Sequence, residues 1–121
     1  MEIRKIGVIG AGQMGNGIAH VMALSGYDVL LNDISEDVLD KATTTIRKNL
    51  ERQVSRDKVT AEAMEAALAR ITPTLTLTDL GATDLVIEAA TDRESVKQAI
   101  FDELLPHLHD HTILTSNTSS I

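Results

Sequence analysis

Short apolar runs alternate along the chain with longer segments in which apolar residues recur every three or four positions. Runs rich in β-branched residues predict buried strands, and helical spacing predicts amphipathic helices. The stretch 71–77 alternates threonine with aliphatic residues around Pro73, which restricts it to an edge strand, because proline has no N–H to donate. Strands are therefore predicted at 3–9, 27–31, 71–77, 84–90 and 112–115.

Capping residues indicate where the first two helices begin and end. The first begins near Met14 and stops at Ser25-Gly26, because glycine accepts the left-handed conformation at a helix end. The second begins after Ser35, a typical N-cap residue, and carries apolar residues at steps of four. Its predicted buried stripe comprises Val38, Ala42, Ile46, Leu50 and Val54.

A third helix is predicted over 61–69, and a fourth begins at a capping box of Thr91 and Glu94 and ends near Pro106. Strands joined by helices form right-handed parallel crossovers with helices on both faces of the sheet. The expected fold is therefore α/β, a Rossmann-type doubly wound parallel sheet of order 3-2-1-4-5 with a helical hairpin between strands two and three. A usual sheet of this kind has six strands, so residues 1–121 are expected to form one incomplete domain.

Composition narrows the classes of function. Hydrophobic residues make up 43% and charged residues 24% of the chain, which is ordinary for a globular domain. Aromatic residues make up only 2%, which argues against stacking platforms for single-stranded nucleic acid. The net charge of −7 has the wrong sign for a general binder of nucleic acid or anionic membranes. The chain has no cysteine, which excludes thiolate metal sites and is consistent with the expected cytoplasmic location.

Residues 10–15 read Gly-Ala-Gly-Gln-Met-Gly, which is the G-x-G-x-x-G pattern of a dinucleotide-binding turn. The pattern follows a predicted strand and opens a predicted helix, as such a site requires. Gly10 would permit a tight turn, Gly12 would let the backbone approach a diphosphate, and Gly15 would let the helix pack closely on the strand. The alternative is a tight turn that binds no ligand.

Asp33 follows the second predicted strand, about twenty residues after the glycine motif, where an acid accepts hydrogen bonds from the adenosine ribose. Its charge would repel a 2′-phosphate, and neither Ile34 nor Ser35 supplies a cation to offset that repulsion. NAD is therefore favoured over NADP. Alternatively, Asp33 is only part of the turn before the next helix.

Six of the 11 basic residues lie within the predicted hairpin. Arg52 stands one helical turn from both Lys48 and Arg56, so a basic ridge opposite the apolar stripe could hold a polyphosphate. Such a ridge would matter if a second ligand were a nucleotide such as coenzyme A. A solvated helix face is the alternative. The six residues are Lys41, Arg47, Lys48, Arg52, Arg56 and Lys58.

Polar residues also follow the predicted fourth and fifth strands, at the edge where open α/β sheets bind ligands. The tract 116–120, Ser-Asn-Thr-Ser-Ser, could orient a substrate carbonyl or a nicotinamide amide, or it could cap a turn into another helix. Thr91, Asp92 and Lys97 lie on the same edge, although Lys97 is also compatible with an ordinary surface lysine.

Histidine and glutamate residues outside these motifs have weaker interpretations. Glu88 is compatible with a proton acceptor or with a buried, hydrogen-bonded carboxyl. His107, His109 and His111 alternate as zinc ligands can, but they lie at the amino end of the sheet, so no metal site is predicted. His20 is interpreted as a packed or surface residue of the first helix.

Together, residues 10–15, Asp33, the basic helix, Glu88-Ala-Ala-Thr-Asp92 with Lys97, and the 116–120 tract resemble the 3-hydroxyacyl-CoA dehydrogenases. The resemblance covers essentially the whole chain and is closest to the bacterial members that act on 3-hydroxybutyryl-CoA. It implies NAD-dependent oxidation of an L-3-hydroxyacyl-CoA, with 3-hydroxybutyryl-CoA as the expected substrate, or the reverse reduction, in fatty-acid or butanoate metabolism. It also implies that the full-length protein is a homodimer.

Residue by residue, the resemblance implies contacts with three chemical groups. Coenzyme A would contact Asn49 and Arg56, and Ser119 would touch both the nicotinamide and the substrate oxygen as a catalytic group. Asp92-Arg93 stands where the family often has Glu-Asn, which shortens one contact without changing its charge. NAD would contact Gly10, Ala11, Gly12, Gln13, Met14, Gly15, Asp33, Ala90, Thr91, Asp92, Lys97, Asn117 and Ser119.

The family's catalytic histidine, the glutamate that orients it and a C-terminal helical domain are expected outside these 121 residues, so this segment alone is expected to be inactive. Two alternatives remain open. One is a β-hydroxyacid dehydrogenase of the 6-phosphogluconate type, which shares the glycine motif but lacks the serine tract. The other is an NAD-binding module without catalysis.

Overall fold

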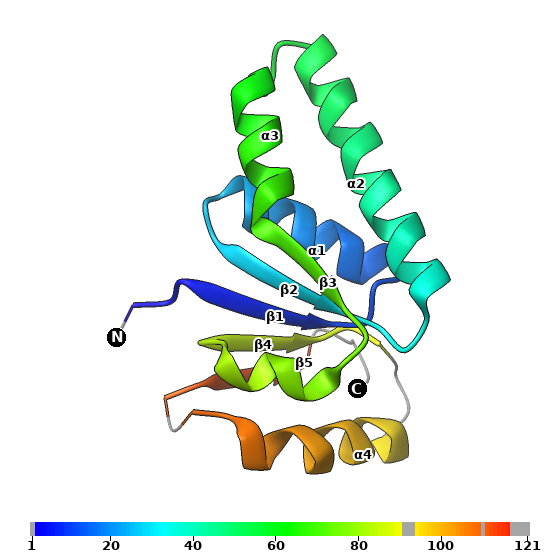
Figure 1. Cartoon of the computed structure of the whole chain (residues 1–121), viewed down its shortest axis with the longest axis vertical. Coiled ribbons are helices and arrows are strands. Elements are labelled where there is room, and N and C mark those ends of the chain that lie inside the picture. Colours follow the sequence, from blue (N-terminus) through cyan, green and yellow to red (C-terminus); the bar gives the residue numbers. More distant parts are fainter. Residues whose placement is uncertain (1, 91–93, 110, 117–121) are drawn as a thin grey trace.

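A computed structural model describes residues 2–90, 94–109 and 111–116, which are built around a five-stranded parallel sheet (Figure 1). The strand order is β3-β2-β1-β4-β5, as predicted. Because all neighbouring strands are parallel, their carboxyl ends lie at one edge of the sheet. The strands are β1 (Lys5–Ile9), β2 (Asp28–Asn32), β3 (Ile71–Thr74), β4 (Leu85–Glu88) and β5 (Ile113–Ser116).

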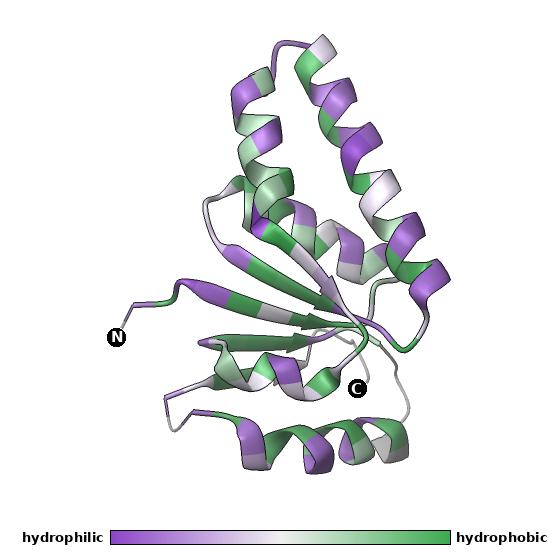
Figure 2. Ribbon diagram, in the orientation of Figure 1, coloured by the Kyte–Doolittle hydropathy of each residue, from purple (hydrophilic) through white to green (hydrophobic). Residues whose placement is uncertain are grey.

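Helices pack on both faces of this sheet. One core lies under the first three helices and the other under the fourth helix and two short 3-10 segments, so the fold is doubly wound. Figure 2 shows hydrophobic strands between helices whose outer faces are hydrophilic. The elements are α1 (Gln13–Leu24), α2 (Glu36–Ser55), α3 (Ala61–Arg70), η1 (Leu77–Ala82), α4 (Glu94–Leu104) and η2 (Leu105–His107).

Alternate strand residues supply the two cores, because successive side chains of a strand point to opposite faces. Ile6 and Val8 of β1 join the core beneath α1, α2 and α3, whereas Ile9 packs with Val86 and Leu104 in the other core. Both cores are aliphatic. Among the described residues, no helix is both long and apolar enough to cross a membrane.

Two predicted helix caps are confirmed. The Val38 N–H donates to the Ser35 side chain (3.3 Å), which caps α2, and Gly26 follows α1 with a φ of +106°. The predicted end of the fourth helix is also confirmed, since α4 gives way to η2 just before Pro106. The Thr91–Glu94 capping box stays a prediction, because Thr91 and the side chain of Glu94 lie outside the described residues.

The third strand is shorter than predicted, ending at Thr74 rather than Leu77. The Thr76 N–H donates to Thr74 Oγ1 (3.0 Å), and the same hydroxyl donates to Asp79 Oδ2 (2.7 Å). Such local bonds favour a turn over an extended strand, and the chain enters η1 instead. Pro73 does lie in an edge strand, in register with Leu31.

The buried stripe of α2 differs from its prediction at both ends. Ala42, Ile46 and Leu50 are buried, but Val38 and Val54 are only half-buried, and Leu39 is buried at the N-terminal end. A step of four residues overshoots one helical turn by about 40°. A series of such steps therefore rotates its outer members away from the core.

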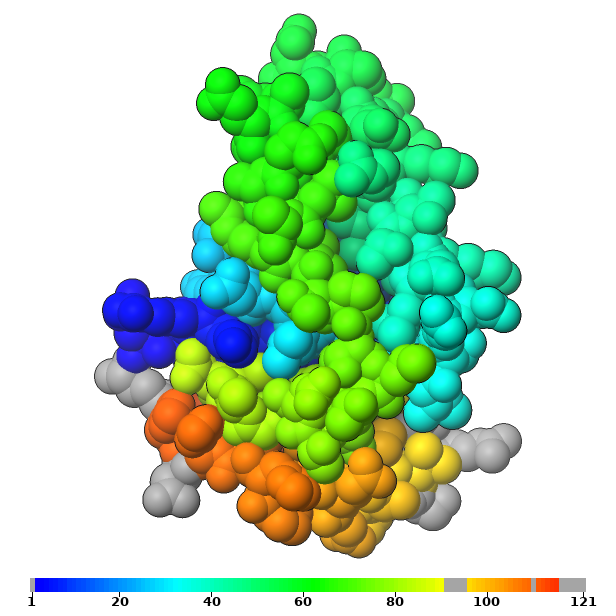
Figure 3. All heavy atoms as spheres, viewed as in Figure 1, coloured from blue at the N-terminus to red at the C-terminus, as the bar shows by residue number. Residues whose placement is uncertain are grey.

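The α2–α3 hairpin projects from the rest of the molecule (Figure 3). Besides apolar packing, polar side chains join it to α1. The Arg70 guanidinium donates to the Ala23 carbonyl at the C-terminal end of α1 (2.9 Å), and His20 Nε2 lies 2.9 Å from Gln53 Oε1. His20 is half-buried, in agreement with its interpretation as a packed residue.

Candidate functional site

The three glycines of residues 10–15 differ in what surrounds them. Gly10 has a φ of +97°, and a Cβ added there would lie 2.7 Å from Ala90 Cα. A Cβ on Gly15 would lie 1.7 Å from the Gly10 carbonyl oxygen. These distances confirm the tight turn at Gly10 and the close packing at Gly15. By contrast, no atom of the described residues lies within 4 Å of a Cβ added to Gly12, so a side chain at this position would point into open space.

The N-terminus of α1, which is fully described, has no side-chain cap. Its N-cap residue is Gly12, and its first turn contains no acidic residue. The first backbone N–H groups of a helix have no partner within the helix and carry a partial positive charge, which favours a bound anion. Gln13 and Met14 in this turn are exposed. The open face of Gly12 and the uncapped amides therefore fit the diphosphate of a dinucleotide.

Asp33 joins the glycine turn to the end of β2. Its Oδ2 accepts the Ala11 N–H (2.9 Å), and its Oδ1 accepts the Ser35 N–H (3.1 Å). The Gly10 N–H also donates to the Asn32 carbonyl (2.7 Å), which holds the two strand ends together. Asp33 therefore stabilises the turn before α2, while its predicted contact with the ribose stays a prediction. Each carboxylate oxygen can accept a second hydrogen bond, so the same geometry is compatible with a ribose hydroxyl.

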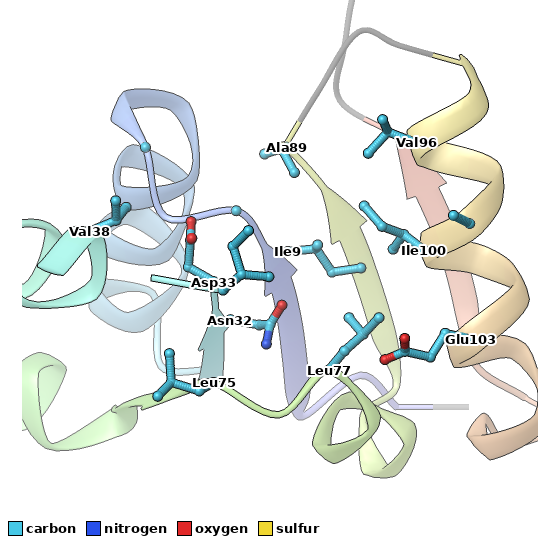
Figure 4. Close-up of a pocket in the computed structure, with 15 residues that line it drawn as sticks. Ile9, Asn32, Asp33, Val38, Leu75, Leu77, Ala89, Val96, Ile100 and Glu103 are labelled. Atoms are coloured by element: carbon cyan, nitrogen blue, oxygen red, sulfur yellow. The ribbon is translucent and has the colours of Figure 1, made fainter. Parts of the chain in front are cut away.

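A hollow of about 580 Å³ lies beside this turn, between the carboxyl ends of β1, β2 and β4 and one face of α4 (Figure 4). Gly10, Gly12, Asp33 and Ala90 are the predicted site residues that line it. The sequence analysis did not predict its apolar wall. One signal was present in the sequence, because a large aliphatic residue, Ile34, stands between Asp33 and the N-cap residue Ser35, and the structure leaves it 96% exposed. The wall comprises Ile9, Ile34, Val38, Leu75, Leu77, Ala89, Val96, Ala99 and Ile100, and the other polar lining residues are Asn32 and Glu103.

Two charged residues near this edge are buried. Glu88 is fully buried, and its Oε2 accepts the Ala90 N–H (2.5 Å), which confirms the interpretation as a hydrogen-bonded buried carboxyl. Lys97 is only 7% exposed, so its interpretation as a surface lysine is wrong. Lys97 is not among the described residues that line the hollow. Its predicted contact with NAD stays a prediction.

Several predicted site residues cannot be placed in this way. Thr91, Asp92, Asn117 and Ser119 lie outside the described residues. Their contacts with NAD and substrate remain predictions.

The predicted basic ridge is divided between separate hollows on the α2–α3 hairpin. Asn49, Arg52, Arg56 and Lys58 line one hollow of about 380 Å³ together with His20 and Gln53. Lys41 and Lys48 line a different one. The two residues predicted to contact coenzyme A therefore share a hollow with two further cations.

The histidines at the opposite edge of the sheet form a polar cluster with Asp84. His111 Nε2 lies 2.9 Å from Asp84 Oδ1, and the rings of His109 and His111 stack with centroids 5.4 Å apart. The Arg4 N–H, the His111 ring and the Lys5 N–H lower the pKa of Asp84 from 3.8 to about 2. No group of three or more His, Asp or Glu among the described residues is arranged to hold a metal ion.

A parallel doubly wound sheet, a glycine turn at an uncapped helix and an acid at the next strand end define a Rossmann-type dinucleotide-binding domain. Residues 5–121 match the family model described as 3-hydroxyacyl-CoA dehydrogenase, NAD binding domain. The chain belongs to this family.

Named relatives and solved structures agree with this assignment. The chain is 56% identical over 119 residues to a 3-hydroxybutyryl-CoA dehydrogenase of Bradyrhizobium diazoefficiens, covering 98% of this chain and 41% of that protein. It is 46% identical to a 3-hydroxyadipyl-CoA dehydrogenase of Escherichia coli, covering 100% of this chain and 26% of that protein. A crystal structure of an Escherichia coli 3-hydroxybutyryl-CoA dehydrogenase superimposes with a TM-score of 0.96 at 45% identity, covering 100% of this chain and 26% of that one. The chain thus spans less than half the length of these relatives.

Proposed function

We propose that this chain is the NAD-binding part of an enzyme that oxidises an L-3-hydroxyacyl-CoA, with 3-hydroxybutyryl-CoA as the substrate, to the 3-oxoacyl-CoA, or catalyses the reverse reduction. The names of the relatives support this reaction class. The observation that carries the proposal is that Gly12, the uncapped start of α1 and Asp33 face one hollow.

The described residues fit NAD in three places. The backbone amides at the start of α1 would hold the diphosphate, and Asp33 would accept hydrogen bonds from the adenosine ribose. The apolar wall of the hollow would hold the adenine ring. When bound, NAD supplies the acceptor for the hydride of the substrate. Ser119 is proposed to contact the substrate oxygen and the nicotinamide.

The hairpin hollow is the proposed site for the phosphates of coenzyme A. Arg52, Arg56 and Lys58 are all exposed there, and Asn49 supplies an amide. Arginine forms short, charge-assisted hydrogen bonds with phosphate oxygens. These cations could therefore bind the phosphates although the chain as a whole is negatively charged. The two ligands would thus occupy different hollows, one at the sheet edge and one on the hairpin.

The test is turnover and binding by the full-length protein. We expect NADH to bind in a calorimetric titration and acetoacetyl-CoA to be reduced far faster than free 3-oxo acids. Arg56→Gln should raise KM for acetoacetyl-CoA about tenfold, as expected for one lost charge-assisted hydrogen bond, and leave NADH affinity unchanged. Lys41→Gln removes the same charge from a different hollow and is the matched control. Turnover of free acids alone would exclude the CoA substrate and favour the 6-phosphogluconate type, whereas NADH binding without any turnover would indicate a non-catalytic module.

We further propose that the full-length protein is a homodimer that works in the cytoplasm. The resemblance supports the first statement, and the absence of cysteine from the sequence is consistent with the second. Sedimentation of the full-length protein tests the dimer. A monomer at micromolar concentration would contradict it.

A further inference from the structure

Glu103 of α4 is exposed to solvent, and it is one of the residues that line the apolar hollow. Val96, Ala99, Ile100 and Glu103 are spaced three or four residues apart and line the hollow from one face of the helix. Figure 4 shows the Glu103 carboxylate extending from α4 toward Leu77. Among the described residues, Glu103 has no side-chain hydrogen bond or ion-pair partner, whereas its neighbour Asp102 accepts a bond from Gln98 (2.8 Å).

The helix dipole weakly disfavours the charge of the exposed Glu103 side chain. This residue lies in the last turn of α4, where the helix dipole disfavours a negative charge, and that turn holds no basic residue in the described helix. Asp33 is the other acid that lines the same hollow. A second carboxylate would weaken the binding of an anionic dinucleotide by charge repulsion, unless the ligand presents a hydrogen-bond donor to it.

Adenine presents such a donor. An ionised carboxylate only accepts hydrogen bonds, and the 6-amino group of adenine can donate to it while the ring packs on aliphatic side chains. Building on the proposed function, we propose that Glu103 recognises the adenine 6-amino group of bound NAD and so determines base specificity. Hypoxanthine carries a 6-oxo acceptor instead of the amino group, and the carboxylate would repel it.

The proposal is tested by comparing NADH with reduced nicotinamide hypoxanthine dinucleotide in fluorescence titrations of the full-length protein. The wild type should bind NADH about tenfold more tightly, as expected for one charge-assisted hydrogen bond. Glu103→Gln should abolish this preference, because the carboxamide can rotate to donate to the 6-oxo group. Asp102→Asn is the matched control, since it removes the same charge one residue away, and it should keep the wild-type preference.

Two outcomes separate this inference from the proposed function. An unchanged preference in Glu103→Gln, or an equal gain in affinity for both dinucleotides, would overturn the role of Glu103 and leave the NAD site intact. Failure of the wild type to bind either dinucleotide would overturn the NAD site itself. Glu103→Ala provides a second variant if the glutamine variant does not fold. It should reduce the preference, because it removes both the hydrogen bond to the 6-amino group and the repulsion of the 6-oxo group.

Discussion

Two aspartates at opposite edges of the sheet make the same kind of contact with the backbone. Asp33, after β2, accepts the N–H groups of Ala11 and Ser35, and Asp84, before β4, accepts those of Arg4 and Lys5. Each aspartate therefore ties together segments that are distant in sequence. These hydrogen bonds alone would make the two aspartates equally good candidates for a ligand-binding residue.

Their surroundings separate them. Asp33 borders a hollow that also holds the open face of Gly12 at an uncapped helix. The second oxygen of Asp84 lies against the His111 ring instead. A carboxylate is thus a candidate for binding when an acceptor position faces space shaped for a ligand, and a structural element when protein groups surround it. Four experiments test this distinction.

The largest effect is expected from Gly12→Val. Its side chain would enter the space beside the first amides of α1, where the diphosphate is proposed to bind. Loss of two charge-assisted hydrogen bonds of about 1.5 kcal/mol each would weaken NADH binding roughly 100-fold. Calorimetric titration measures this, and an unchanged melting temperature shows that the fold is intact. Wild-type affinity for NADH in this variant would show that the diphosphate does not bind beside Gly12.

Exchanging the carboxylates for amides tests the two edges directly. Asp33→Asn should weaken NADH binding about tenfold and narrow the preference for NADH over NADPH, because the charge that repels a 2′-phosphate is gone. Asp84→Asn should leave binding unchanged and lower the urea midpoint of unfolding. Reversal of these two results would show that Asp84, rather than Asp33, takes part in NAD binding.

Acid should destabilise the protein through Asp84. Its pKa in the folded protein is lowered from 3.8 to about 2, chiefly by the Arg4 N–H, so the charged form is favoured by folding. The resulting stability is present above the unfolded-state pKa and is lost as the pH falls from 3.8 toward about 2. Urea midpoints of the wild type and Asp84→Asn should therefore converge over this range. Parallel curves would contradict the assignment.

The smallest effect is expected from His111→Gln. The side chain is 46% exposed, and partners at the surface contribute little because solvent screens them. The Arg4 and Lys5 amides still bind Asp84 in this variant. Its urea midpoint should therefore fall by less than that of Asp84→Asn. A larger fall would mean that the histidine, rather than the backbone, is the main partner of Asp84.

The positions of the strands and the geometry of the glycine turn could be predicted because both depend on local signals. Strand and helix periodicities differ, and the right-handed crossover rule then restricts the order of the sheet. Gly10 and Gly15 could be interpreted one residue at a time, since each position excludes a side chain for a local reason. Asp33 could be located because it ends a strand next to that turn.

The wall of the hollow could not be predicted in this way. Leu77 comes from a 3-10 segment that the sequence pattern assigned to a strand, and Ile100 comes from a helix elsewhere in the chain. Their meeting depends on tertiary packing rather than on spacing. The burial of Lys97 escaped prediction for a related reason, because a long charged side chain on an amphipathic helix is usually exposed.

Pro73 affects the tendency of the protein to aggregate through the edge of its sheet. A parallel sheet with an open outer strand offers a template on which strands of other molecules can assemble into aggregates. The outer strand β3 is only four residues long, and its proline lacks one of the N–H groups that such growth requires. This side of the sheet therefore resists edge-to-edge polymerisation, even when the protein is concentrated.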